Sequence, residues 1–321
     1  MVHQLSLVSS IPHSNYLQTI ATLQAITGIF HPQQISTYTL ITKPNHVFKP
    51  KFEPGKINQI EQYYMKCITT WSNRDLDISQ PILNNRVNGV DDIVARKLFT
   101  DEEDDGDGDE VGGGKNQFGK EKVWTLQISD IPIAGKNQTC SQQTIYESTL
   151  VHTHVAAVDK SDMSDAMEVD IKQEMESKPD AAQVDPSSSS SAASNSIVKN
   201  RRNGSFLLFL NDLGYAVINQ YWIKGVRFFY GDVIIELFKI FIRDDSQGDD
   251  EVGNGIKLKL LDESNTFQIK CYINVAKSTD IEVINSGIKE LGHLQDFLKG
   301  LFLLEISDRM FLDSRVTSSV K

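Results

Sequence analysis

Apolar residues recur at every second position from Phe267 to Val275, and this alternation constrains the fold more than any other feature of the 321-residue chain. A two-residue period places the apolar side chains on one face of a β-strand and the intervening side chains on the other. Three of the intervening residues are polar, namely Gln268, Lys270 and Asn274. The segment therefore predicts an antiparallel strand with one buried and one hydrated face.

Further strands are predicted on both sides of this one. The apolar runs Tyr215–Ile223, Val226–Tyr230 and Asp232–Ile242 are separated by Lys224-Gly225 and Gly231-Asp232, which are short glycine-containing breaks typical of tight hairpins. Shorter strands are predicted over 5–7, 35–43, 124–128, 142–155 and 301–306, and the stretch 60–72 is ambiguous between helix and strand.

Two helices are predicted from a spacing of three to four residues between apolar positions. The first covers 14–27 and ends at Gly28, with Leu17, Ile20, Leu23 and Ile26 on its inner face. The second begins at a capping box, Thr279-Asp280-Ile281-Glu282, and ends at Gly300. Its predicted inner face comprises Ile281, Ile284, Ile288, Leu291, Leu294 and Leu298.

The order of these elements predicts the fold class. Strands follow one another directly, and the alternation of strand and helix that produces a parallel sheet is missing. We therefore predict an α+β fold, a many-stranded antiparallel curved sheet or barrel-like fold with flanking helices. Residues 215–242 carry apolar groups on both strand faces, and two helices are few to cover a curved sheet. An exposed apolar patch that binds a partner is therefore expected.

Acidic residues are concentrated in three segments. Residues 101–114 carry eight carboxylates, 157–198 carry nine carboxylates and three lysines, and 244–251 carry five carboxylates. The net charge of the whole chain is −11, so the remainder is mildly basic at about +8. Solvated loops explain these segments, and a basic surface for an acidic partner or nucleic acid is the alternative.

The two longer acidic segments contain too few apolar residues to fold by burial. They divide the predicted single domain into separate parts. The predicted parts are an N-terminal strand-helix part (1–98), an acidic disordered insertion (99–120), central strands (121–156), a disordered linker (157–203) and a C-terminal β-rich part with the capped helix (204–321).

Candidates for chemistry are few. His152 and His154 would share one strand face, but no third ligand follows at metal-binding spacing. Glu236 stands alone in its predicted strand, either as a catalytic acid or as a buried carboxylate paired with Lys or Arg. A tunnel enzyme that hydrolyses triphosphates needs paired carboxylates to hold a divalent metal. The Glu-x-Glu pair, Glu174 and Glu176, lies in the predicted linker. We predict no catalytic residue, metal or cofactor.

Other classes of partner are also disfavoured. Apolar runs stay well short of the ~18–20 residues of a membrane helix, so no membrane partner is expected. Lys257 and Lys259 share a strand face without the aromatic residues of a single-strand platform, so no sequence-specific nucleic acid is expected. Three distant cysteines, Cys67, Cys140 and Cys271, indicate a reducing compartment.

Two short motifs in the predicted linker are candidates for regulation. Lys199, Arg201 and Arg202 form a basic cluster of the kind that directs nuclear import. Ile171-Lys172-Gln173-Glu174 has the apolar-Lys-x-Glu form favoured for sumoylation at Lys172.

An ordered set of motifs resembles one family, fungal Mediator subunit 18. The first is Trp124-Thr-Leu-Gln-Ile-Ser-Asp130-Ile131-Pro132-Ile-Ala-Gly135, and Gln143-Thr-Ile follows it. The later motifs are Leu213-Gly-Tyr, Ile223-Lys-Gly-Val-Arg-Phe-Phe, Ile235-Glu-Leu-Phe-Lys-Ile, Tyr272-Ile-Asn-Val, Asp308-Arg309 and Asp313-Ser-Arg315-Val. The resemblance is good over 1–30, 123–155 and 205–316 and poor over 43–120.

The resemblance implies a non-catalytic subunit of the head module of the Mediator coactivator, which acts with RNA polymerase II in the nucleus. It implies a barrel-like fold, a heterodimer with Mediator subunit 20 and a tethering helix from Mediator subunit 8. The motif residues are then structural or interface residues: Trp124, Asp130, Ile131, Pro132, Gly135, Asp308, Arg309, Asp313 and Arg315. Because the family's fold is similar to that of tunnel RNA triphosphatases, a tunnel-type triphosphatase or RNA-processing enzyme is the alternative.

Overall fold

The structure is a computed structural model that describes residues 1–46, 62–71, 76–82, 93–94, 98–101, 120–135, 138–151, 206–245 and 255–316. The chain divides into two compact units, Met1–Val151 with Gly214–Lys321, and His152–Leu213. In the second unit the described part is helix α4 (Phe206–Asp212). All other described helices and strands belong to the first unit.

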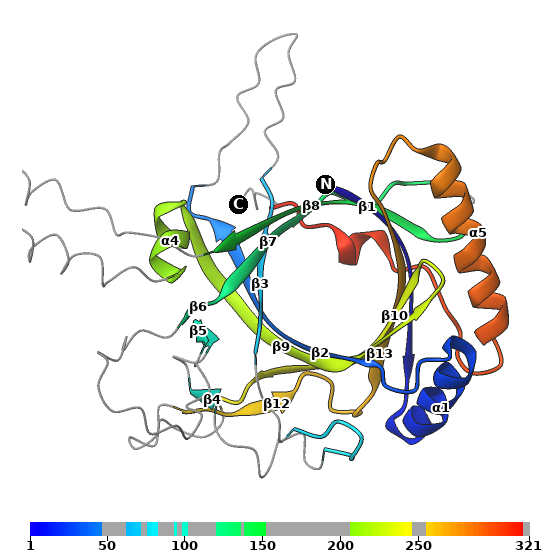
Figure 1. Ribbon diagram of the computed structural model, residues 1–321. Coiled ribbons are helices and arrows are strands. Elements are labelled where there is room, and N and C mark those ends of the chain that lie inside the picture. The colour runs from blue at the N-terminus through cyan, green and yellow to red at the C-terminus, as the bar shows by residue number, and fades with distance from the viewer. Residues whose placement is uncertain are drawn as a thin grey trace, which may run out of the picture. The chain divides into compact units, whose positions relative to one another are not determined.

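Eight antiparallel strands in the described part of the first unit close into a barrel (Figure 1). Their order around the ring is β10 (Val233–Arg243), β13 (Phe267–Val275), β1 (Val2–Ile11), β8 (Ser141–Val151), β7 (Val123–Ser129), β3 (Met65–Thr70), β2 (Gln33–Pro44) and β9 (Tyr215–Tyr230). The ring closes because β9 pairs back onto β10, from Tyr230 opposite Val233 to Trp222 opposite Phe241. The predicted α+β fold with a barrel-like antiparallel sheet is confirmed.

The remaining described elements are short or lie outside the ring. They are η1 (His13–Asn15), α1 (Tyr16–Thr27), β4 (Ile93–Val94), β5 (Thr100–Asp101), β6 (Lys120–Glu121), β11 (Gly255–Ile256), β12 (Leu258–Leu260), α5 (Ile281–Leu298) and η5 (Arg309–Leu312). β12 pairs with the end of β10, β4 with β11, and β5 with β6. None of the helices in the described ranges is long and apolar enough to cross a membrane.

The strongest apolar packing of the barrel lies on its outer surface, under the helices. A Cβ atom added to Gly287 of α5 would lie 2.8 Å from Cδ1 of Leu5, so the helix rests almost directly on β1. Leu5, Leu7 and the alternating apolar residues of β13 are buried on this side. Because side chains alternate along a strand, Gln268, Lys270 and Asn274 face the barrel lumen. The hydrated face expected for this strand is therefore the lumen.

Closure of the barrel changes the expectation of a large exposed apolar face on 215–242. Val233, Ile235, Leu237 and Phe241 are buried on the outer side of β10. The opposite face of the same strand, which includes Phe238, is enclosed by the ring and is half-buried. The ring thus covers the lumen face of β10, but part of the expected exposed apolar surface is present on β9, where Val217, Ile218, Phe229 and Tyr230 are 39–53% exposed.

One predicted hairpin is wrong. Residues 215–230 form a single strand through Gly225, which pairs with Phe238 on one side and Ile35 on the other. A Cβ atom at Gly225 would lie 2.2 Å from the carbonyl oxygen of Leu237. The glycine thus permits a close approach of two strands and does not form a turn. The predicted hairpin at Gly231-Asp232 is present, with Gly231 at a φ of 58°.

Both helices form, with adjusted faces. Leu23 of α1 is buried as predicted, but Leu17 is 69% exposed, and Tyr16 and Thr19 are buried in addition. In α5, Leu291, Leu294 and Leu298 are buried as predicted, whereas Ile281 at the helix start is 68% exposed. The N-cap is Asp280, one residue after the predicted capping residue Thr279. Its carboxylate accepts a hydrogen bond from the Val283 N–H at 3.3 Å.

The ambiguous stretch 60–72 contains β3. The strand expected over 301–306 is wrong, because only a single bridge forms there, between Glu305 and Val8. Cys67, Cys140 and Cys271 are buried free thiols. The histidine pair 152 and 154, Lys172, and the basic cluster Lys199, Arg201 and Arg202 lie outside the described residues.

Candidate functional site

Residues 305–316, here called the C-terminal strap, cross one end of the barrel after α5. At the first end of the strap, Glu305 and Val8 exchange two backbone hydrogen bonds of 2.8 and 2.9 Å. At the other end, Tyr64 N–H donates to the Ser314 carbonyl and Val316 N–H donates to the Gln62 carbonyl, each at 2.7 Å. In Figure 1 the strap, in red, lies within the outline of the ring. It therefore links β1 with the start of β3, across two intervening strands.

The strap is joined to the loop that follows β7. Arg309 Nε donates a hydrogen bond of 2.7 Å to the Pro132 carbonyl oxygen. The side-chain amide of Gln143 donates to the Asp130 carbonyl at 2.7 Å and to the Leu312 carbonyl at 3.0 Å. Gln143 is buried, so these bonds are shielded from competing water. Gln143 thus holds together two segments that lie more than 170 residues apart in the sequence.

Aspartates shape the strap from within. Asp308 is the N-cap of η5 and accepts a hydrogen bond from Met310 N–H at 2.9 Å. Asp313 and Arg315 form an ion pair with a separation of 2.7 Å between Oδ2 and Nη2. The hydrogen bond from Arg315 lowers the pKa of the Asp313 carboxyl below its ordinary value. These local bonds restrict the conformations of the strap before any partner is bound.

Two large apolar side chains project from this restrained segment into solvent. Met310 is 71% exposed and Phe311 is 87% exposed, although both belong to η5. Exposed aromatic residues on a rigid frame lose little conformational entropy on binding, which suits them as anchors in a protein interface. The arrangement can bind an apolar groove of a partner.

The motif residues fall into two groups. Asp130, Pro132, Asp308, Arg309 and Arg315 belong to the network around the strap, described above. Ile131 joins them through its N–H, which donates to Asp130 Oδ1 at 2.8 Å, and Gly135 follows in the same loop.

Trp124 lies apart from that network. It is 0% exposed, stacks on Phe99 with ring centroids 5.8 Å apart, and meets Tyr38 edge-on at 6.1 Å. It is a packing residue of the outer barrel surface.

The sequence did not predict the contacts of Gln143, Ser129 and Ser314. The Ser129 carbonyl accepts a hydrogen bond from Ser314 Oγ. Gln143 stood within the recognised motif, but only the fold shows what its amide contacts.

Glu236 is engaged by neighbouring side chains. Its Oε1 accepts hydrogen bonds from Arg227 at 2.6 and 2.8 Å and from the Tyr272 hydroxyl at 3.0 Å. Of the two interpretations left open by the sequence, this geometry is that of a carboxylate paired with an arginine. Among the residues that the structure describes, no group of three or more His, Cys, Asp or Glu side chains could hold a metal ion.

Comparison with known proteins decides the family. A sequence model of a family described as Med18 protein matches residues 3–315. The Candida albicans protein named Mediator of RNA polymerase II transcription subunit 18 is 52% identical, over 98% of this chain and 99% of its own length. The chain belongs to the Mediator subunit 18 family. The Debaryomyces hansenii subunit 18 is 50% identical over 99% of both chains, and the resemblance deduced from the motifs is thereby confirmed.

A solved structure supports the fold of this family member. A chain in the structure of the Schizosaccharomyces pombe Mediator head module superposes with a TM-score of 0.52, covering 95% of this chain and 98% of its own length. The two sequences are only 11% identical, so this likeness concerns the fold alone.

Proposed function

We propose that this chain is a non-catalytic, protein-binding subunit of the Mediator head module, which helps to transmit regulatory signals to RNA polymerase II at promoters in the nucleus. Its subunit 18 relatives carry Mediator of RNA polymerase II transcription in their names, which supports a role in the same assembly. The partners that we propose are Mediator subunit 20, as a heterodimer, and a helix of Mediator subunit 8.

The C-terminal strap carries this proposal. Phe311 is the most exposed large apolar side chain in the described part of the chain, and the segment around it is fixed by hydrogen bonds at both ends. A mobile tail would have to be ordered on binding at a cost in entropy, whereas the strap is already ordered. We therefore propose that Met310 and Phe311 anchor one of the two partner subunits.

The alternative, a tunnel-type triphosphatase or RNA-processing enzyme, is disfavoured by the geometry of Glu236. A carboxylate that serves as a metal ligand must have free lone pairs directed at the ion. Oε1 of Glu236 already accepts bonds from Arg227 and Tyr272. The Arg227 charge also neutralises the carboxylate, which reduces its attraction for a metal ion.

The test compares two substitutions of similarly exposed phenylalanines in the full chain, co-expressed with Mediator subunits 20 and 8. Phe311→Ser should weaken the complex by about 30-fold, the effect of losing an interface anchor worth about 2 kcal/mol. Phe30→Ser is the matched control, because Phe30 is 71% exposed in the turn after α1, far along the chain from the strap. Size-exclusion chromatography and titration calorimetry measure assembly.

Unchanged assembly of the Phe311→Ser protein would refute the anchor. Failure of the wild-type chain to assemble with either subunit would refute the proposed partners. Metal-dependent release of phosphate from triphosphate-ended RNA, lost in Glu236→Ala, would decide for the enzyme instead.

A further inference from the structure

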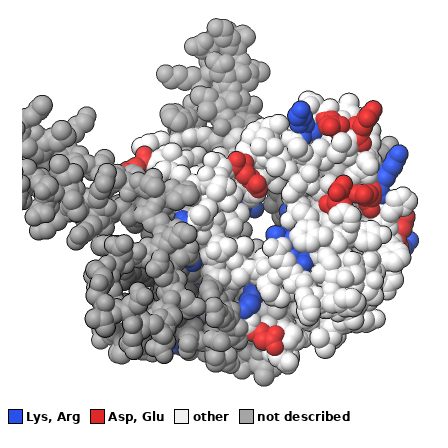
Figure 2. Space-filling model, viewed as in Figure 1, with Lys and Arg blue, Asp and Glu red and all other residues white. Residues whose placement is uncertain are grey.

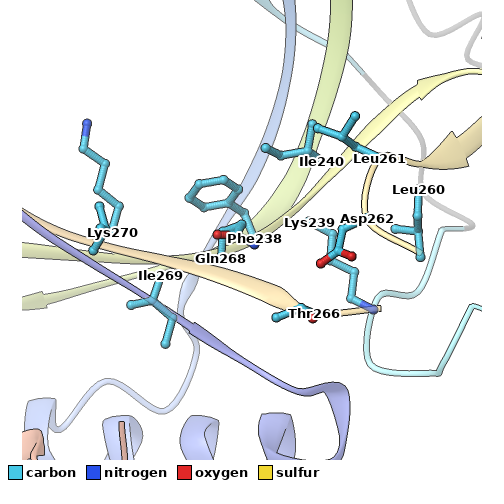
Figure 3. A pocket seen from close by; sticks show the side chains of 11 residues that line it. Phe238, Lys239, Ile240, Leu260, Leu261, Asp262, Thr266, Gln268, Ile269 and Lys270 are labelled. Atoms are coloured by element: carbon cyan, nitrogen blue, oxygen red, sulfur yellow. The ribbon is translucent and has the colours of Figure 1, made fainter. Parts of the chain in front are cut away.

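The described strands direct more basic than acidic side chains into the barrel lumen. The strand register directs Lys66 of β3, Arg227 of β9 and Lys270 of β13 toward the lumen, because their neighbours Cys67, Val226 and Ile269 are buried on the outer side. Figure 3 shows the two faces directly: Lys270 and Phe238 extend to one side of β13 and β10, and Ile269 extends to the other, toward the helices. Figure 2 shows Lys and Arg side chains around the central opening.

One of the three cations is neutralised within the barrel. Arg227 Nη2 lies 2.6 Å from Glu236 Oε1, and the Tyr272 hydroxyl donates to the same oxygen. Glu147, the other carboxylate whose charge acts on the lumen, accepts a hydrogen bond of 2.6 Å from Gln127. Arg227 and Glu236 therefore form a direct pair, and Glu236 and Glu147 act on Lys270 through their charges without contacting it.

The two lysines have few favourable contacts. Lys270 Nζ donates to Gln4 Oε1 at 2.7 Å and lies 4.9 Å from the centre of the Tyr272 ring, so its direct partners are neutral. Gln4 Nε2 in turn donates to Asn274 Oδ1 at 3.0 Å, which fixes the orientation of the amide. Lys66 Nζ makes no hydrogen bond or ion pair within the described ranges of the chain.

Burial lowers the pKa of both amines, and the charge of Lys66 adds to the effect at Lys270. Burial lowers the pKa of Lys66 from its ordinary value. Burial, followed by the charge of Lys66, lowers the pKa of Lys270 to about 8. Two like charges within one enclosed space repel, and partial burial costs each of them solvation energy. An anion between them would offset both costs.

A cavity gives access to one of the two lysines. A space of about 320 Å³ is lined by Val8, Phe238, Ile240, Gln268 and Lys270, among others, near the end of β10 and the start of β13. Most of its lining is apolar, and Lys270 is the cation on its lumen side (Figure 3).

We propose that the barrel lumen binds a small phosphate-type oxyanion between the ammonium groups of Lys66 and Lys270. Lysine binds phosphate oxygens as a point charge, and two ammonium groups match an anion that carries two or more negative charges. Diphosphate, free or borne by a nucleotide, has this chemistry. The site holds the anion without hydrolysing it, because Glu236 is already paired with Arg227. The bound anion would brace β3 against β13 across the ring.

The test measures binding of inorganic pyrophosphate to the full chain, alone or in its complex, by titration calorimetry at pH 7 and constant ionic strength. Lys66→Met and Lys270→Met should each weaken binding at least tenfold. Lys289→Met, on the exposed side of α5, should change it by less than twofold. Lys270→Arg, which keeps the charge, should retain binding within about fivefold and controls for damage to the fold.

Two further measurements separate this site from nonspecific attraction. Affinity of the wild-type chain should fall as the pH is raised above about 8, because Lys270 then loses its proton. ADP distinguishes the source: lysine-dependent binding of ADP assigns a nucleotide-borne diphosphate, and lysine-dependent binding of pyrophosphate alone assigns the free anion. No saturable binding of either, or equal binding by the wild type and both Lys→Met proteins, would overturn the proposal.

Discussion

At the scale of single residues, the aromatic cluster on the outer barrel surface is the most concentrated source of stability. Trp124 and Trp222 are both 0% exposed, and Tyr38 lies between them, 4.9 Å from the Trp222 ring centre. Each such side chain buries a large apolar area, and ring contacts add to it. The cluster joins β7, β2 and β9, which are far apart in the sequence.

We predict that Trp124→Ala lowers the free energy of unfolding by about 3–5 kcal/mol, as removal of a buried aromatic ring leaves a cavity. Trp124→Phe should cost less, because it keeps part of the ring packing against Phe99 and Tyr38. Urea denaturation measures both. An unchanged midpoint for Trp124→Ala would contradict the packing role.

Lys239 is a buried lysine that, in contrast to Lys66 and Lys270, does not face the lumen. It lies on the outer side of β10, is 1% exposed, and hydrogen-bonds to Asn265, with its Nζ 3.1 Å from His13 Nδ1. Its Nζ also lies 4.4 Å from the centre of the Phe267 ring. Burial lowers the pKa of Lys239 to about 8, and the charge of Asp262 opposes this shift. Holding the charged amine in this site costs stability.

This cost predicts a dependence of stability on pH. Between about pH 8 and 10.5 the unfolded chain keeps a proton on Lys239 that the folded chain has lost, so this residue makes the protein more stable as the pH rises. Lys239→Met removes the effect. The stability of the Met protein relative to wild type should therefore fall by about 2–3 kcal/mol between pH 7 and 10.5.

Urea denaturation at each pH measures this difference, and Lys289→Met, an exposed lysine substitution, is the control that should show no trend. Comparison with wild type cancels the buried tyrosines and cysteines, whose raised pKa values act in the opposite direction at high pH. A difference that stays constant with pH would show that Lys239 keeps its proton in the folded protein up to the ordinary pKa of lysine, so that burial does not lower its pKa.

At the scale of elements, β9 contains a glycine whose structural role differs from the turn that its sequence neighbours suggest. Lys224-Gly225 between two apolar runs resembles a hairpin turn, but both residues lie inside β9, a single strand of 16 residues. Gly225 is opposite Ile35 in β2 and Phe238 in β10, and both partner strands continue past it. The absence of a side chain lets β10 approach, which no local pattern can reveal.

We predict that Gly225→Ala lowers the free energy of unfolding by about 1–3 kcal/mol, because the added methyl group would overlap the Leu237 carbonyl and strands must move apart. Gly292→Ala in α5 is the matched control. A Cβ at Gly292 meets nothing within 4 Å, so alanine should raise stability by about 0.5–1 kcal/mol through helix propensity. Thermal and urea unfolding of both proteins check this. Equal effects would contradict the role of Gly225.

At the scale of the whole molecule, the barrel has an apolar outer surface under helices and a partly polar lumen. Leu5 and Leu7 of β1 face α5, while Gln4 faces the lumen and contacts Lys270. This arrangement depends on closure, because the pairing of β9 with β10 encloses a face that would otherwise be exposed. The same closure brings Lys66 and Lys270 into one enclosed space.

The sequence by itself determined the type of most elements and the family. The alternation from Phe267 to Val275 identified β13 to the residue, and the ordered motifs from Trp124 to Arg315 identified the Mediator subunit 18 family. Both are local signals, because a strand's period and a motif's letters can be read within a short window.

Only the tertiary structure decided which face of each strand lies inside and which distant segments meet. A two-residue period assigns side chains to the two faces of a strand, but strand pairing and closure of the barrel determine which face lies inside. Likewise, the sequence placed Asp130 and Arg309 in one family pattern, and only the fold shows that Gln143 and Pro132 join their segments. These contacts join segments that lie more than a hundred residues apart in the chain, so no short stretch of the sequence reveals them.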